Sequence, residues 1–125
     1  MISSENQPAS REFDPAALAR LQKIGGRKLV LGILNIFLNQ TPERLAVITA
    51  AFQTGDFETL GNTAHSLKSS AGNVGAANLQ QAAETLETEA DRPKPEISAD
   101  LIEELERFAT NAVAYFTAKR KEYNP

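Results

Sequence analysis

From Thr63 to Gly75 the chain reads TAHSLKSSAGNVG, a run that contains its single histidine, His65. Successive residues of an α-helix are offset by about 100° around its axis. A helix through this run and the residues before it gathers its apolar side chains on one face: Leu60, Leu67, Ala71 and Val74. His65 points nearly the opposite way. The spacing therefore predicts an amphipathic helix whose histidine faces solvent or a partner rather than the core.

The neighbours of His65 on that outer face are small, with one exception. They are Gly61, Lys68, Ser69 and Gly72. A glycine inside a helix costs about 1 kcal/mol relative to alanine, and an exposed face offers no packing to offset that cost. We interpret Gly61, Ser69 and Gly72 as small residues that leave the surface around His65 open to the close approach of another protein. The alternative is structural: Gly61 accommodates a neighbouring loop, and Gly72 helps to end the helix.

His65 has the chemistry of a group carrier. An imidazole accepts and releases groups near neutral pH and forms covalent intermediates. Transfer of a phosphoryl group also needs nearby positive charge, and Lys68 lies one helical turn away on the same face. A histidine on a helix surface is also often just a solvated residue, so the motif alone leaves both interpretations open.

The rest of the chain predicts further helices and no strands. Asp14-Pro15 begins a short helix that ends at Gly25-Gly26, and helical spacing resumes from Arg27 to Thr54. Within that segment, Thr41-Pro42 indicates locally either a stop and restart or a kink in one helix.

Gly55-Asp56 separates this segment from the histidine helix, predicted from Phe57 to about Asn73. Another helix follows Gly75 and ends at Ala90, and Ser98 caps the last one. Short loops and one-sided apolar faces predict an all-α fold. It is an antiparallel up-down four-helix bundle with a short additional N-terminal helix.

Composition limits the classes of function. The chain has 125 residues, enough for one domain, with residues 1–13 expected to be a flexible arm or linker and residues 14–122 the bundle. It has no cysteine, a net charge of −3 with both signs interspersed, and no secretory or membrane-spanning segment. We therefore expect a cytoplasmic protein that binds neither nucleic acid nor membranes, with no metal site and no intrinsic kinase activity.

The run from Ala64 to Gly75 resembles the signature of histidine-containing phosphotransfer (HPt) domains, His-x-Leu-Lys-Gly followed by small residues, an apolar residue and glycine. The resemblance extends over roughly Asp14 to Phe116. It implies that Arg27 to Thr54 form one helix with Pro42 inside it. One departure is Ser69, where the family most often has glycine.

The resemblance implies a phosphorelay intermediate. His65 accepts a phosphoryl group from a receiver-domain aspartyl phosphate and passes it to another receiver, Lys68 stabilises the phosphoryl oxygens, and Ser69 and Gly72 allow docking. This chain needs no cofactor, since magnesium belongs to the receiver. We expect its partners to be response-regulator receivers and a hybrid sensor kinase, and we expect the chain to be a monomer.

Two other functions fit the residues. One is a helical module that docks on a receiver or another protein without being phosphorylated. The other is a sensor-kinase fragment with dimerisation and phosphoacceptor helices, against which the missing ATP-binding portion argues.

Overall fold

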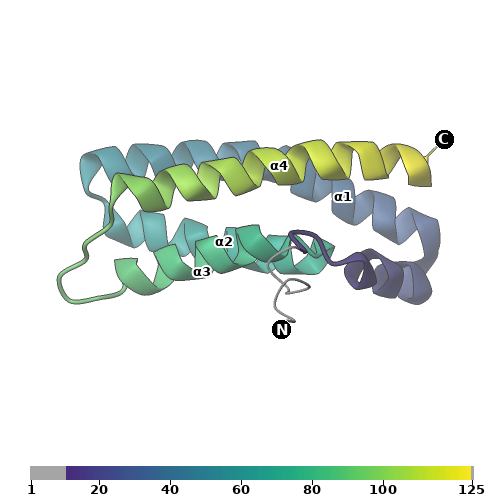
Figure 1. The fold of residues 1–125 in the computed structure, drawn as a ribbon, viewed down its shortest axis with the longest axis horizontal. Helices are drawn as coiled ribbons and strands as arrows, with labels where there is room; N and C mark the ends of the chain where they lie inside the picture. Colours follow the sequence, from purple (N-terminus) through teal and green to yellow (C-terminus); the bar gives the residue numbers. More distant parts are fainter. Residues whose placement is uncertain (1–10, 125) are drawn as a thin grey trace, which may run out of the picture.

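A computed structural model describes residues 11–124, which form four antiparallel helices and no strands (Figure 1). The helices are α1 (Pro15–Thr54), α2 (Phe57–Val74), α3 (Ala77–Ala90) and α4 (Ala99–Tyr123). The predicted all-α bundle is confirmed. No helix in this part of the chain combines the length and the apolar character that crossing a membrane requires.

Helix α1 contains both the short leading helix and the long one. Asp14 caps it by accepting a hydrogen bond from the Ala16 amide at 3.0 Å. Gly26 interrupts the helical backbone with φ 73° and ψ −169°, a combination open to glycine, and the chain changes direction there. The short helix and the long helix therefore meet at a glycine kink, as the sequence predicted.

Pro42 lies inside α1 and does not end it. The local interpretation of Thr41-Pro42 as a stop and restart is therefore wrong, and the continuous helix implied by the family resemblance is correct. Phe37 and Ile48, on either side of the proline, are 1% and 0% exposed. Their packing holds both halves of the helix in line despite the missing backbone hydrogen bond.

Ends of α1, α2 and α4 follow the chemistry of their capping residues. Gly55 and Gly75 end α1 and α2 with φ of 75° and 87°, in the left-handed region where glycine is favoured. Asp56 accepts a hydrogen bond from the Thr59 amide, and hydrogen bonds from Thr59 hold the pKa of Asp56 below its usual range. Ser98 caps α4 by accepting from the Leu101 amide at 3.3 Å.

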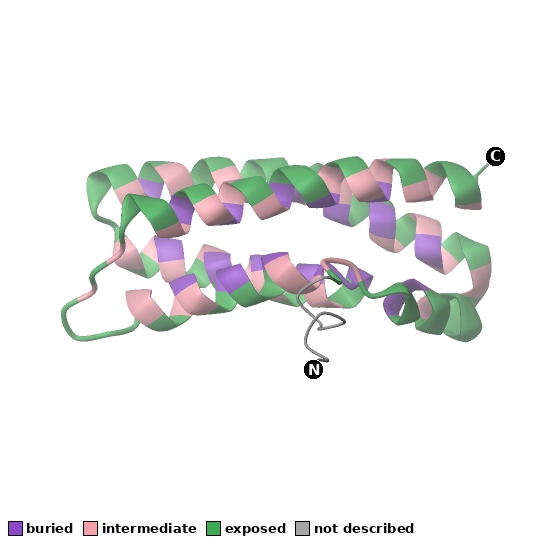
Figure 2. Ribbon diagram, viewed as in Figure 1, coloured by how far each residue is buried: buried purple, intermediate pink, exposed green. Residues whose placement is uncertain are grey.

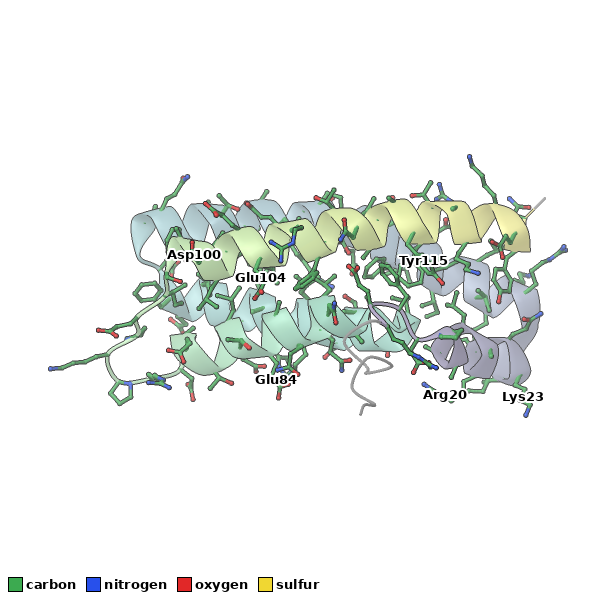
Figure 3. All side chains as sticks on the ribbon, in the orientation of Figure 1. Arg20, Lys23, Glu84, Asp100, Glu104 and Tyr115 are labelled. Carbon is green, nitrogen blue, oxygen red and sulfur yellow. The ribbon has the colours of Figure 1, made fainter. Side chains whose placement is uncertain are left out.

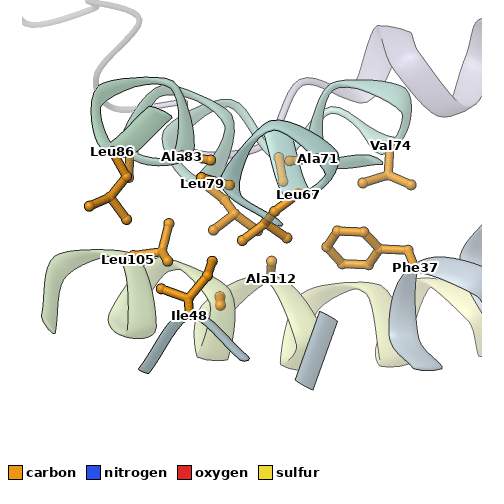
Figure 4. Packing of buried hydrophobic residues seen from close by; sticks show 14 of the residues in the cluster. Phe37, Ile48, Leu67, Ala71, Val74, Leu79, Ala83, Leu86, Leu105 and Ala112 are labelled. Atoms are coloured by element: carbon orange, nitrogen blue, oxygen red, sulfur yellow. The ribbon is translucent and has the colours of Figure 1, made fainter. Parts of the chain in front are cut away.

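A single apolar core runs along the bundle axis, with buried positions facing inward from all four helices (Figures 2 and 4). The four apolar positions predicted on the inner face of α2 are at most 1% exposed: Leu60, Leu67, Ala71 and Val74. They pack with Phe37 and Ile48 of α1, Leu79 and Leu86 of α3, and Leu105 and Ala112 of α4. The angular argument that placed His65 outside is confirmed.

The segment before α1 also contacts the bundle. Phe13 forms an antiparallel bridge with Ala76, and its ring stacks on Tyr115 with centroids 4.0 Å apart. The Glu12 carbonyl accepts a hydrogen bond from the Ala77 amide at 2.9 Å. The prediction placed Glu12 and Phe13 in a flexible arm, whereas here they pack on the domain. Residues 1–10 of that arm lie outside the described residues.

Charges are separated along the bundle rather than interspersed. Residues 15–42 and 107–121 contain eight lysines and arginines and no acidic residue, whereas residues 43–106 contain twelve acidic and four basic residues. Figure 3 shows the two groups toward opposite ends, with Arg20 and Lys23 at one end and Asp100 and Glu104 toward the other. His65 belongs to the acidic portion.

Candidate functional site

His65 lies in the middle of α2 with 59% of its side chain exposed. Its Nδ1 is 2.7 Å from Oε2 of Glu87 on α3. An ionised carboxylate can only accept hydrogen bonds, so this contact assigns the proton to Nδ1. Nε2 then carries the free lone pair of the ring. A nucleophilic nitrogen is thus held on a rigid helix by a partner on the neighbouring helix.

Lys68 shares the same carboxylate. Its Nζ is 2.7 Å from Oε1 of Glu87, so the two oxygens of Glu87 bind one side chain each. The bond from Lys68, with a smaller contribution from His65, lowers the pKa of Glu87 against the opposing effect of partial burial. The same bond to Glu87 raises the pKa of Lys68. Glu87 is therefore ionised and Lys68 charged at neutral pH.

The hairpin of α2 and α3 brings these residues together. The helices are joined by the tight connection at Gly75-Ala76, so residues about equally far from it lie opposite one another. His65 is ten residues before Gly75, and Glu87 is eleven residues after Ala76. Sequence reasoning missed Glu87 as a site residue. Counting residues in both directions from the connection would have identified Glu87, because it gives the α3 position that faces the histidine.

Gly61 and Gly72 lie on the side of α2 that faces α3. A Cβ atom on Gly61 would be 3.2 Å from Cβ of Ala90, and one on Gly72 would be 2.8 Å from Nε2 of Gln80. The prediction placed both glycines on a face without packing, and that premise is wrong because α3 lies against them. The missing side chain of Gly61 lets the two helices approach closely, whereas a side chain at Gly72 would only have to displace the flexible end of exposed Gln80.

A groove lies beside the site between α2 and α3. Lys68 and Glu87 line it, together with further acidic side chains of both helices and their loops: Glu58, Glu84 and Asp91. Ser69 is exposed on α2 one residue beyond Lys68. The docking role of Gly61, Ser69 and Gly72 stays a prediction, since no partner chain is present.

Helix α1 supports the histidine helix from its other side. Nη1 of Arg44 donates to Oγ of Ser70 at 3.1 Å and to the carbonyl of Ser66 at 3.4 Å. Ser66 directly follows His65, so the backbone that carries the imidazole is held from α1 as well as packed against α3. Arg44 was also missed, because a contact between residues 22 positions apart depends on helix packing that the local pattern does not specify.

Comparison with known proteins identifies the family of this chain. The family model described as "Hpt domain" matches residues 32–114, which include His65, Lys68 and Glu87. The chain belongs to the Hpt domain family. Its structure also resembles the crystal structure of histidine-containing phosphotransfer protein B (HptB) from Pseudomonas aeruginosa PAO1. The identity is 32%, the TM-score 0.84, and the match covers 92% of this chain and 99% of that one. Comparison with curated proteins gives no significant match.

The Hpt assignment confirms the family resemblance and identifies the chain as a histidine phosphotransfer protein of the phosphorelay class. His65 is the one histidine in the sequence. No group of three histidine, cysteine, aspartate or glutamate side chains within residues 11–124 is arranged to hold a metal ion.

Proposed function

We propose that this Hpt domain carries phosphoryl groups on His65 from the aspartyl phosphate of one response-regulator receiver to the aspartate of another. The observation that carries the proposal is the contact between Nδ1 of His65 and Glu87, together with the exposure of the ring. It leaves Nε2 as the nucleophile on a side chain that a partner can reach.

The transfer exchanges one bond for another. The lone pair of Nε2 forms the bond to phosphorus, and the bond from phosphorus to the aspartyl oxygen breaks, leaving the receiver with a free carboxylate. Passing the group to a second receiver reverses these changes with that receiver's carboxylate as the nucleophile. Lys68 is close enough to the imidazole, through their common partner Glu87, to offset the negative charge of the phosphoryl oxygens.

The receivers supply the remaining parts of the reaction, including the magnesium ion. A receiver carried by a hybrid sensor kinase is one source of the phosphoryl group, and we propose that the chain acts as a monomer. Ser69 is exposed close to His65 along the helix, and its small side chain leaves room at the surface where the receiver docks.

The test is incubation of the full chain with a phosphorylated receiver. We expect an acid-labile, alkali-stable phosphoprotein, and we expect His65→Gln to remain unlabelled while far-UV circular dichroism shows unchanged helicity. Lys68→Met provides a second variant, expected to retain the acceptor nitrogen but to transfer more slowly. Labelling that persists in His65→Gln would show that the acceptor is wrongly assigned.

Receiver binding without phosphohistidine would instead favour the module that docks without carrying phosphate. Binding is measured by titration with the unphosphorylated receiver, so it is separate from labelling. Normal binding combined with no label on the wild-type chain would overturn the carrier role.

A further inference from the structure

We propose that Glu87 keeps phosphorylated His65 in its reactive form, with the ring proton retained on Nδ1, and so sets how long the phosphohistidine lasts. The proposal rests on the proposed function and concerns the step after the phosphoryl group has arrived. Its starting observation is that one carboxylate contacts both His65 and Lys68, each at 2.7 Å.

Phosphorylation changes the charge on the imidazole ring. When Nε2 bonds to phosphorus and the Nδ1 proton stays in place, the imidazole becomes a positively charged phosphoimidazolium. Oε2 of Glu87 already accepts the hydrogen bond from Nδ1, so a full negative charge faces the new positive charge across a short contact. A neutral hydrogen-bond partner at the same place would hold this proton less well.

The ring proton determines how good a leaving group the imidazole is. From the protonated ring, the N–P bond breaks with its electron pair returning to Nε2, and the ring leaves as neutral imidazole. From the unprotonated ring, the same cleavage would release an imidazolate anion, which is a much poorer leaving group. Retaining the proton on Nδ1 therefore speeds transfer to the next aspartate and also shortens the lifetime of the phosphohistidine in water.

Glu87 also positions Lys68. Its Nζ is bound to Oε1 of Glu87, so the lysine must be shared between that carboxylate and the phosphoryl oxygens. Glu87 therefore holds the ammonium group of Lys68 beside the imidazole, where it can offset the charge of the phosphoryl oxygens while the ring proton is retained.

Other charged groups near the site also bear on its pH dependence. Glu84 interacts electrostatically with Lys68, and the carboxylates of Glu58 and Asp91 line the same groove. On the α1 side, Arg44 binds Ser66 and Ser70. Within residues 11–124, Glu87 is the acidic group in hydrogen-bond contact with the imidazole, so its removal should affect the ring most.

The experiment compares wild type with Glu87→Gln, which has nearly the same shape and can still accept from Nδ1 but lacks the charge. Both full chains are phosphorylated chemically with phosphoramidate, freed of reagent, and followed by ³¹P NMR from pH 5 to pH 9. As the pH rises, the rate of phosphohistidine loss drops when the ring loses its proton. We expect this drop in Glu87→Gln to occur at a pH about one unit lower than in wild type. That shift makes the phosphohistidine about tenfold longer lived at pH 8.

Glu84→Gln is the matched control, because it removes a carboxylate of the same helix and groove without touching His65. It should keep the wild-type pH profile. Glu87→Asp retains the charge on a shorter side chain and should restore part of the wild-type profile. If Glu87→Gln loses helicity, this second variant carries the comparison, with a smaller shift in the same direction expected.

Two results would overturn the proposal: the same pH profile in Glu87→Gln as in wild type, or equal shifts in Glu87→Gln and Glu84→Gln. Chemical phosphorylation needs no receiver, so these results are independent of whether any receiver exchanges phosphate with the chain. Failure of receiver transfer with a normal Glu87 effect would count against the proposed function alone.

Discussion

Gly75 ends the histidine helix, and its replacement by alanine should destabilise the protein more than an equivalent change elsewhere. Its φ of 87° lies in the left-handed region, which costs a residue with a Cβ atom about 1–2 kcal/mol. An added Cβ would also lie 2.5 Å from the carbonyl oxygen of Asp14 and 2.9 Å from Cβ of Ala17. Backbone cannot move aside as a flexible side chain can, so the segment before α1 must shift.

That shift breaks a specific contact. The Asp14 amide donates to the Gly75 carbonyl at 2.8 Å, and losing this hydrogen bond costs about 1 kcal/mol. Adding the two contributions gives a loss of about 2–3 kcal/mol in the free energy of unfolding for Gly75→Ala. The segment and its neighbours Glu12 and Phe13 should loosen together.

Gly55→Ala is the control. Gly55 has a similar φ of 75°, but nothing lies within 4 Å of its added Cβ. It should therefore lose only the conformational part, about 1–2 kcal/mol. Urea unfolding followed by circular dichroism at 222 nm measures both variants. A loss for Gly75→Ala no larger than that for Gly55→Ala would refute the steric reasoning.

Three further predictions concern stability. Thr41 is 0% exposed, and its Oγ1 lacks a hydrogen-bond partner among the described residues. Thr41→Val should therefore raise the free energy of unfolding by about 1 kcal/mol, which is measured as a higher urea midpoint. Phe13→Ala should cost about 2 kcal/mol because it removes the partial burial of the ring against the core as well as its stacking on Tyr115, and an unchanged midpoint would contradict the packing of this segment. The lowered pKa of Glu87 means that its pair with Lys68 stabilises the fold at neutral pH and that this contribution is lost as the pH falls through the folded pKa. Glu87→Gln should therefore reduce the difference in urea midpoint between pH 7 and pH 3.

The sequence predicted features that depend on residues close together in the chain. Exposure of His65 followed from helical spacing, and the ends of the helices followed from Asp14, Gly55 and Ser98. Pro42 showed the limit of local rules, because packing of Phe37 and Ile48 on either side determines whether the helix continues. The family resemblance supplied the correct answer there.

The site itself was predicted in part. His65 and Lys68 lie on one helix and were predicted from their spacing. Glu87 lies on the next helix, so predicting its contact with His65 requires knowing how α2 and α3 align in the hairpin. The same register explains Gly61 and Gly72. Their neighbours on α3 could not be inferred from α2 alone, so the pattern of α2 left both partner docking and a structural role open for these glycines.

The separation of charge along the bundle gives the molecule an electric dipole, with His65 in the portion where acidic residues outnumber basic ones twelve to four. Before any contact forms, the negative field of this portion attracts cationic surfaces and repels anionic ones. Receivers with basic residues around their phosphorylation site should therefore associate fastest. Salt should reduce this advantage, since the Debye length is only about 10 Å at 0.1 M ionic strength.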